Sequence, residues 1–177
     1  IGRNVPYVLD PTFLLELSDY DRLEQPSGIT GDYLFFYAIG PSIRQRILVN
    51  KMAKKLGLKV VSWNPQHYVL DKLLIRNLVQ PKIQNPGVWL NLIKNAKFVM
   101  PASFHGSVFS VMYGKDFSPL ARDKDNRLEI FKEFILNYKT LQNGDLPQIF
   151  TPDDVNTKRL EELKTSSLNY LRSALNE

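Results

Sequence analysis

The amino-acid sequence predicts an α/β domain with a mostly parallel sheet and helices on both of its faces. Short apolar runs suited to buried strands alternate with longer segments in which apolar residues recur at helical spacing. This alternation is typical of right-handed βαβ crossovers, which place helices over both faces of a parallel sheet. The expected strands are Tyr33–Ile39, Leu58–Trp63, Lys97–Ala102 and Phe117–Leu120. The 177 residues contain no internal repeat, so one domain over residues 1–177 is predicted.

Composition excludes several classes of protein. Hydrophobic residues make up 44% of the chain, which is normal for a globular domain. The chain has no cysteine, which excludes disulfides and thiolate metal sites and favours a reducing, cytoplasmic compartment. The longest apolar run is too short to cross a bilayer, so no transmembrane segment is predicted. The net charge of +5 comes from scattered lysines and arginines interleaved with 18 acidic residues, which argues against nucleic acid as a partner.

The N-terminal part contains the first predicted strand. An extended segment breaks at Asp10-Pro11, and Ser18 is a candidate N-cap for a short helix over Asp19–Glu24. Tyr33–Ile39 is a continuous, aromatic-rich run that ends at Gly40-Pro41. Such a run predicts a buried central strand followed by a turn.

Two helices and a second strand are predicted next. After Ser42 one helical face carries five apolar residues: Ile43, Ile47, Leu48, Met52 and Leu56. Gly57 follows them at the position where a helix C-cap favours glycine. The strand Leu58–Trp63 comes next. Tyr68–Val79 is predicted to be helical throughout, because its leucines have helical spacing, and Pro81 ends it.

The stretch from Asn85 to Phe117 predicts a helix, a strand, a tight turn and a second helix. Asn85 is the expected N-cap of the first helix, with Pro86 at its first position. One face of this helix is apolar: Trp89, Leu92, Ile93 and Ala96. The second helix, around Val108–Met112, is apolar almost all round and is expected in the core.

The remainder of the chain is expected to be mostly helical. Leu128–Leu136 is predicted to form a helix, and Thr157–Leu175 an amphipathic closing helix with five leucines: Leu160, Leu163, Leu168, Leu171 and Leu175. We expect the apolar face of the closing helix to pack partly against a domain absent from this chain. The chain begins with Ile1-Gly2 instead of Met, which indicates a piece of a longer protein.

The turn Ser103-Phe104-His105-Gly106 is the strongest candidate site. A strand-to-helix turn in a parallel sheet lies at the carboxyl ends of the strands, where such sheets bind ligands. Ser103 can cap the helix, and the first N–H groups of that helix form a potential anion site. Spacing alone favours a structural reading instead, in which Ser103 caps, His105 satisfies a core hydrogen bond and Gly106 packs. The other histidine, His67, is assigned a surface or packing role, and no acidic partner for His105 is apparent.

Several segments resemble, in order, the polysaccharide pyruvyl transferase family. The most specific are Gly87–Val99 and Ser103–Ser110, the Ser-Phe-His-Gly block with its preceding helix. Weaker matches support them by their order: Leu9–Leu15, Tyr33–Tyr37, Asn126–Leu128 and Ser167–Leu175. The resemblance implies a Rossmann-like domain that forms the C-terminal half of a longer GT-B-like protein, with the N-terminal domain missing here.

The resemblance also implies a reaction. Members of the family transfer pyruvyl from phosphoenolpyruvate to a sugar as a ketal, in exopolysaccharide biosynthesis, without a cofactor or a metal. On this reading His105 is the catalytic acid/base or phosphate contact. The residues expected to bind the substrate are Ser103, Phe104, Gly106, Ser107, Arg122, Asn126 and Arg127. The isolated half is expected to be inactive, because the glycan hydroxyls and further cations would come from the missing half.

An alternative is a non-catalytic sugar- or nucleotide-binding half of a GT-B-like protein. This alternative is supported by departures from the family pattern at Val88, Ala102 and Ser103.

Overall fold

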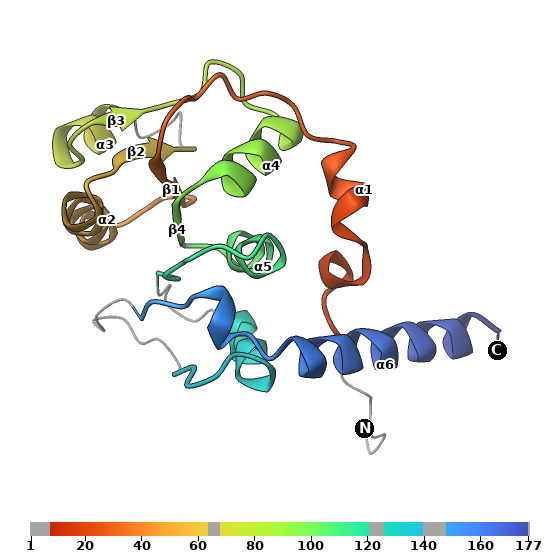
Figure 1. Ribbon diagram of the computed structural model, residues 1–177. Coiled ribbons are helices and arrows are strands. Elements are labelled where there is room, and N and C mark those ends of the chain that lie inside the picture. Colours follow the sequence, from red (N-terminus) through yellow and green to blue (C-terminus); the bar gives the residue numbers. More distant parts are fainter. Residues whose placement is uncertain (1–7, 64–67, 121–125, 140–147, 177) are drawn as a thin grey trace.

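A computed structural model describes residues 8–63, 68–120, 126–139 and 148–176, whose central feature is a parallel sheet (Figure 1). The strands lie in the order β3-β2-β1-β4, and all three pairings are parallel. Their bounds are Tyr33–Tyr37 for β1, Lys59–Ser62 for β2, Leu78–Val79 for β3 and Phe98–Pro101 for β4. The predicted α/β class is therefore confirmed.

Helices cover both faces of this sheet, as predicted. The α-helices are α1 (Leu17–Asp21), α2 (Ile43–Leu56), α3 (Tyr68–Leu74), α4 (Pro86–Asn95), α5 (Phe104–Met112) and α6 (Thr157–Asn176). On one face, Val49 of α2 and Ile75, the residue that follows α3, are buried in one cluster with Leu34 of β1. On the other face, α4 and α5 pack against Phe35 of the same strand. Side chains alternate between faces along a strand, so β1 supplies both cores.

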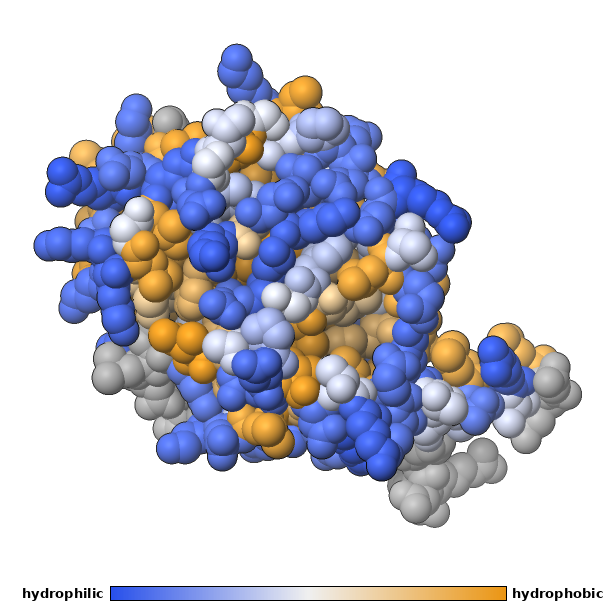
Figure 2. All heavy atoms as spheres, in the orientation of Figure 1, coloured by the Kyte–Doolittle hydropathy of each residue, from blue (hydrophilic) through white to orange (hydrophobic). Residues whose placement is uncertain are grey.

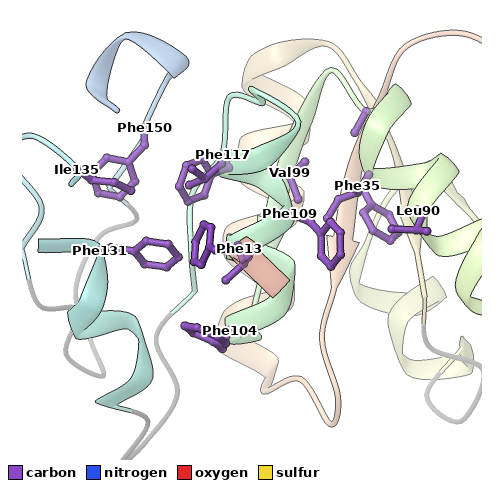
Figure 3. Packing of buried hydrophobic residues seen from close by; sticks show 14 of the residues in the cluster. Phe13, Phe35, Leu90, Val99, Phe104, Phe109, Phe117, Phe131, Ile135 and Phe150 are labelled. Atoms are coloured by element: carbon purple, nitrogen blue, oxygen red, sulfur yellow. The ribbon is translucent and has the colours of Figure 1, made fainter. Parts of the chain in front are cut away.

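The larger core is rich in phenylalanine (Figure 3). Phe13 comes from η1 (Pro11–Leu14), and Phe131 from η3 (Asn126–Glu133), both short 3-10 helices. Phe134 contacts both rings edge-on, with centroids 5.6 Å from Phe13 and 5.5 Å from Phe131. The N-terminal and C-terminal segments are therefore joined through one aromatic cluster next to α5.

Helix ends occur where the sequence predicted them in two helices. Ser42 caps α2 by accepting a hydrogen bond from the Gln45 N–H at 3.1 Å, and Gly57 ends the helix with φ of 67°. Asn85 caps α4 by accepting from the Val88 N–H at 2.9 Å. Side-chain capping satisfies N–H groups that have no partner within the helix.

Two predictions that concern the sheet need correction. The helix predicted over Tyr68–Val79 ends at Leu74, and Leu78–Val79 is the edge strand β3. Asn77 breaks the helix because it adopts φ of 54°, a conformation that asparagine tolerates better than most residues. The predicted strand Phe117–Leu120 is reduced to isolated bridges at Phe117, one parallel to Val99 of β4, as expected, and one antiparallel to Phe150.

Two helix predictions are also wrong in detail. The short N-terminal helix begins at Leu17 with Glu16 as its N-cap, because the Glu16 side chain and Asp19 form a capping box in place of the expected Ser18 cap. The helix predicted over Leu128–Leu136 is the 3-10 helix η3. A further short 3-10 helix, η4 (Pro152–Asp154), precedes α6.

Helix α6 is attached to the body through its first half and projects beyond it at its C-terminal end (Figure 1). Ser167 is buried on α6, and its hydroxyl accepts a hydrogen bond from the Leu9 N–H at 2.9 Å. Further along the helix the expected apolar face is uncovered: Leu171 and Leu175 are exposed, Leu175 to 85%. Figure 2 shows hydrophobic atoms on this projecting end.

A buried ion pair joins α2 to α3. Arg46 Nε lies 2.6 Å from Asp71 Oδ1, and both side chains are almost fully buried. Arg46 also donates to the carbonyl of Pro41, in the loop after β1. Two of the pair's atoms, Arg46 Nη2 and Asp71 Oδ2, have no hydrogen-bond partner. The pair therefore fixes the loop after β1 without recovering its full desolvation cost.

Candidate functional site

The turn between β4 and α5 carries the candidate site. Ser103 is the N-cap of α5: its hydroxyl accepts from the Gly106 N–H at 3.0 Å, and its carbonyl from the Ser107 N–H at 3.2 Å. Phe104 and His105 precede the first intrahelical hydrogen bond. Their N–H groups therefore lie at the positive end of the helix, where anions are favoured.

Gly106 allows this turn to lie against the sheet. A Cβ atom at position 106 would lie 2.7 Å from Pro101 Cβ and 3.1 Å from Tyr37 Cδ1. Pro101 ends β4 and Tyr37 ends β1, so the first turn of α5 packs onto the carboxyl ends of both strands. The packing role suggested for Gly106 by spacing is thus confirmed. Any side chain here would push the helix N-terminus away from the sheet.

The position of this turn within the sheet is also distinctive. From β1 the chain continues through α2 to β2 on one side, while β4 pairs with β1 on the other side. The connections of an open parallel sheet therefore diverge between β1 and β4, and such a point forms a crevice that binds ligands. Tyr37 lies there, half-buried beside Trp89 with ring centroids 5.2 Å apart. Burial raises the pKa of the Tyr37 phenol, which keeps it neutral and able to donate a hydrogen bond.

His105 has an acidic neighbour that the sequence did not reveal. Its Nε2 atom lies 3.8 Å from Oδ2 of Asp10, and the side chains are 54% and 29% exposed respectively. The other carboxylate oxygen of Asp10 accepts from the Thr12 N–H at 2.9 Å and so caps η1. Spacing gives no signal of this pair, because the two residues lie far apart in the sequence, at positions 10 and 105. The only hint is that Asp10 falls in one of the family-like segments.

Arg127 supplies a cation at the same place. Its Cζ atom lies 5.6 Å from the centroid of the Phe104 ring, a geometry that permits a cation–π contact. The Phe104 ring is itself buried and stacks on Phe131 at 6.3 Å (Figure 3). Packing of Phe131 in the core therefore positions η3 so that Arg127 contacts Phe104, the residue before His105.

The other predicted site residues divide into two groups. Ser107 lies beside Ser103, but it is buried and its hydroxyl donates to the Ser103 carbonyl at 3.2 Å, a role within the helix. Arg122 and His67 lie outside the described residues. Asn126 begins η3, and only its backbone is described. The structure therefore brings together Ser103–Ser107 and Arg127, to which Asp10 is now added.

The described ranges contain neither a metal-binding cluster nor a membrane-spanning helix. Within them, no group of three or more His, Cys, Asp or Glu residues could hold a metal ion. No helix among the same residues is both long and apolar enough to span a bilayer.

The fold and the site define an α/β domain with helix N–H donors, an arginine and a histidine–carboxylate pair at the carboxyl edge of its parallel sheet. A family model described as polysaccharide pyruvyl transferase matches residues 1–124, well over half of the chain. The chain belongs to the polysaccharide pyruvyl transferase family.

Comparison with solved structures gives a match to a UDP-GlcNAc 2-epimerase from Neisseria meningitidis bound to UDP-GlcNAc. The identity is 16% and the TM-score 0.45, and the match covers 66% of this chain and 34% of the epimerase chain. The matched region thus spans about a third of that protein. Curated protein sequences give no match.

Proposed function

We propose that this chain is the C-terminal half of a two-domain pyruvyl transferase that forms a ketal between phosphoenolpyruvate and two hydroxyls of a glycan. Family membership supports the class of reaction. The site is supported by the position of His105 in the first turn of α5, beside the free N–H groups of that turn. Arg127 lies next to it, because its guanidinium contacts the ring of Phe104, the residue before His105. A phosphate or carboxylate is the ligand that such donors favour.

The reaction requires two proton transfers. One glycan oxygen bonds to C2 of phosphoenolpyruvate while its proton is delivered to the C3 methylene, which becomes a methyl group. The C2–O bond to phosphate then breaks, and phosphate leaves with the bonding electrons. The second glycan oxygen bonds to C2, and its proton leaves with the phosphate. His105 is proposed to move these protons, since imidazole exchanges protons near neutral pH.

The proposed anion contacts are made by the backbone and by Arg127. The side chains of Phe104 and Ser107 serve the fold, so their proposed part is to present the start of α5 to the ligand. Ser103 and Gly106 hold that start against β1 and β4. The contributions of Arg122 and Asn126 to the anion clamp remain proposals from the resemblance.

Anion binding by this chain is the first test. Chemical-shift titration with inorganic phosphate and with phosphoenolpyruvate should perturb residues around His105 and Arg127. His105→Gln should weaken binding about tenfold or more, because a hydrogen bond to a charged group contributes about 1.5–3 kcal/mol. His67→Gln is the matched control, since these are the two histidines of the chain. Perturbations confined to residues remote from His105 would refute the site.

Turnover is the second test and needs the full-length protein. Phosphate release from phosphoenolpyruvate should require a glycan acceptor, and His105→Gln should lower the rate at least a hundredfold, as expected when an acid/base is lost. Anion binding without phosphate release by the full-length protein would favour the non-catalytic alternative.

A further inference from the structure

The carboxylate of Asp10 is held in a fixed orientation toward His105. One of its oxygens accepts the Thr12 N–H at 2.9 Å as the N-cap of η1. The second oxygen is thereby directed to the imidazole, 3.8 Å from Nε2. A freely rotating surface aspartate would not have this restraint, so the pairing follows from the fold of η1.

The backbone around Asp10 is also restrained. The buried N–H of Leu9 donates to the Ser167 hydroxyl of α6 at 2.9 Å. On the other side, the carbonyl of Thr12 accepts from the Tyr20 hydroxyl at 3.0 Å, and Phe13 is buried in the aromatic cluster. Contacts from three separate segments therefore fix the position of the Asp10 carboxylate before any ligand binds.

His105, by contrast, is more than half exposed. An exposed imidazole can rotate about its side-chain bonds, so it needs an external partner to keep one ring nitrogen directed at a substrate. In the described part of the chain, the acid facing His105 is Asp10. A separation of 3.8 Å is longer than a hydrogen bond, but catalytic hydrogen bonds are commonly long in ligand-free enzymes and shorten when substrate binds.

We infer that Asp10 is a positioning residue for His105, and this inference rests on the proposed function. Asp10 accepts the Nε2–H, which leaves Nδ1 as the atom that exchanges protons with the substrate. As the first glycan oxygen bonds to C2, Nδ1 takes the hydroxyl proton and delivers it to C3, so the imidazole ends the step neutral. The Asp10 carboxylate stabilises the imidazolium formed in between, as a buried aspartate does for histidine in hydrolytic triads.

Asp10→Asn tests this role in the full-length protein. Asparagine is as good an N-cap as aspartate, so the variant removes the charge and keeps the cap of η1. We expect kcat to fall about 10- to 100-fold, the usual cost of losing a group that orients a catalytic histidine. The dissociation constant for inorganic phosphate should stay the same or decrease, because a negative charge next to the anion is removed. In a His105→Gln background the same change should lower kcat no further.

The control is Asp32→Asn. Asp32 is exposed and precedes β1, at the edge of the sheet opposite His105, so rate and affinity should both stay at wild-type values. The melting temperature of each variant is measured alongside. An Asp10→Asn protein that loses rate, phosphate affinity and melting temperature together would assign Asp10 to the fold alone and overturn the inference.

A second readout does not depend on activity. In this chain with the His67→Gln substitution, His105 is the one remaining histidine, so the imidazole ¹⁵N signals come from His105 alone. We expect the neutral ring to carry its proton on Nε2, and Asp10→Asn to change both ring-nitrogen shifts. A proton on Nδ1, or a spectrum unchanged by Asp10→Asn, would overturn the pairing.

The two readouts separate the possible failures. If the full-length protein releases no phosphate from phosphoenolpyruvate, the proposed function fails, and the spectrum still decides the pairing. If it does release phosphate and Asp10→Asn leaves kcat unchanged, the inference alone fails.

Discussion

The buried ion pair between α2 and α3 predicts a large and strongly non-additive effect of mutation. Arg46→Met or Asp71→Leu alone leaves one buried charge without its partner, which costs about 3–5 kcal/mol of unfolding free energy. The double variant removes both charges and is expected to lie within about 2 kcal/mol of wild type, the residual cost coming from the Pro41 carbonyl that loses its donor. The coupling energy should therefore be about 4 kcal/mol or more.

Two features of the structure set this magnitude. Both side chains are nearly inaccessible to water, so neither charge can be rescued by solvent. The unpartnered Arg46 Nη2 and Asp71 Oδ2 atoms mean that the wild-type pair is itself incompletely satisfied, which limits what the double variant loses.

Urea unfolding of the four proteins, followed by circular dichroism and linear extrapolation, gives the coupling energy directly. The control cycle uses Arg159→Met and Glu133→Leu, because this pair is 3.2 Å apart but largely exposed. Its coupling should not exceed about 1 kcal/mol. Single variants at positions 46 and 71 that each cost less than 1 kcal/mol, or a double variant as unstable as the sum of the two, would refute the reasoning.

Three further changes test other contacts. Gly106→Ala places a carbon 2.7 Å from Pro101 Cβ, so melting should fall by several degrees, corresponding to about 1–3 kcal/mol of overpacking. Ser167→Ala leaves the buried N–H of Leu9 without an acceptor and should lower the urea-unfolding free energy by about 1–3 kcal/mol. Burial, with a neighbouring carboxylate, raises the pKa of Tyr113 from 10.0 to about 12, so stability that this phenol contributes below pH 10 should be lost as the pH rises to about 12. Tyr113→Phe should abolish that loss and the matching step in tyrosinate absorbance.

Each of these predictions has a matched control variant or a stated result that would contradict it. Ala in place of Gly normally stabilises a helix, so an unchanged or higher melting temperature of Gly106→Ala would contradict the clash. Ser166→Ala, at the exposed neighbour of Ser167, should leave stability unchanged. Tyr170→Phe, at an exposed position of α6, should leave the absorbance step near pH 12 in place.

The helices with explicit end signals could be predicted from the sequence. Ser42 and Gly57 delimit α2, and Asn85 with Pro86 starts α4, because capping chemistry is local and depends on residue type. The buried central strand was also predictable, since Tyr33–Tyr37 is apolar on both of its faces.

Predictions failed where non-local contacts decide the structure. Leu78 continues the leucine spacing of α3, but pairing with Val60 draws it into the sheet as β3. At the site, the turn before α5 was predicted because Ser103–Gly106 lies between a predicted strand and a predicted helix. The place of Asp10 in the site was not predicted, because its approach to His105 depends on the position of η1, which contacts of Ser167 and Phe13 hold in place.

The hydrogen bond between Leu9 and Ser167 has a consequence for folding during synthesis. Its two residues are 158 positions apart, so the amide of Leu9 has left the ribosome long before its acceptor is made. The sheet can form as the chain emerges, since β2, β3 and β4 each pair with a strand that is already translated. The hydrogen bond that restrains the segment with Asp10, by contrast, can form only after Ser167 of α6 is released. The fully restrained His105–Asp10 pair is therefore expected to form only after Ser167 has been made, long after Asp10 itself.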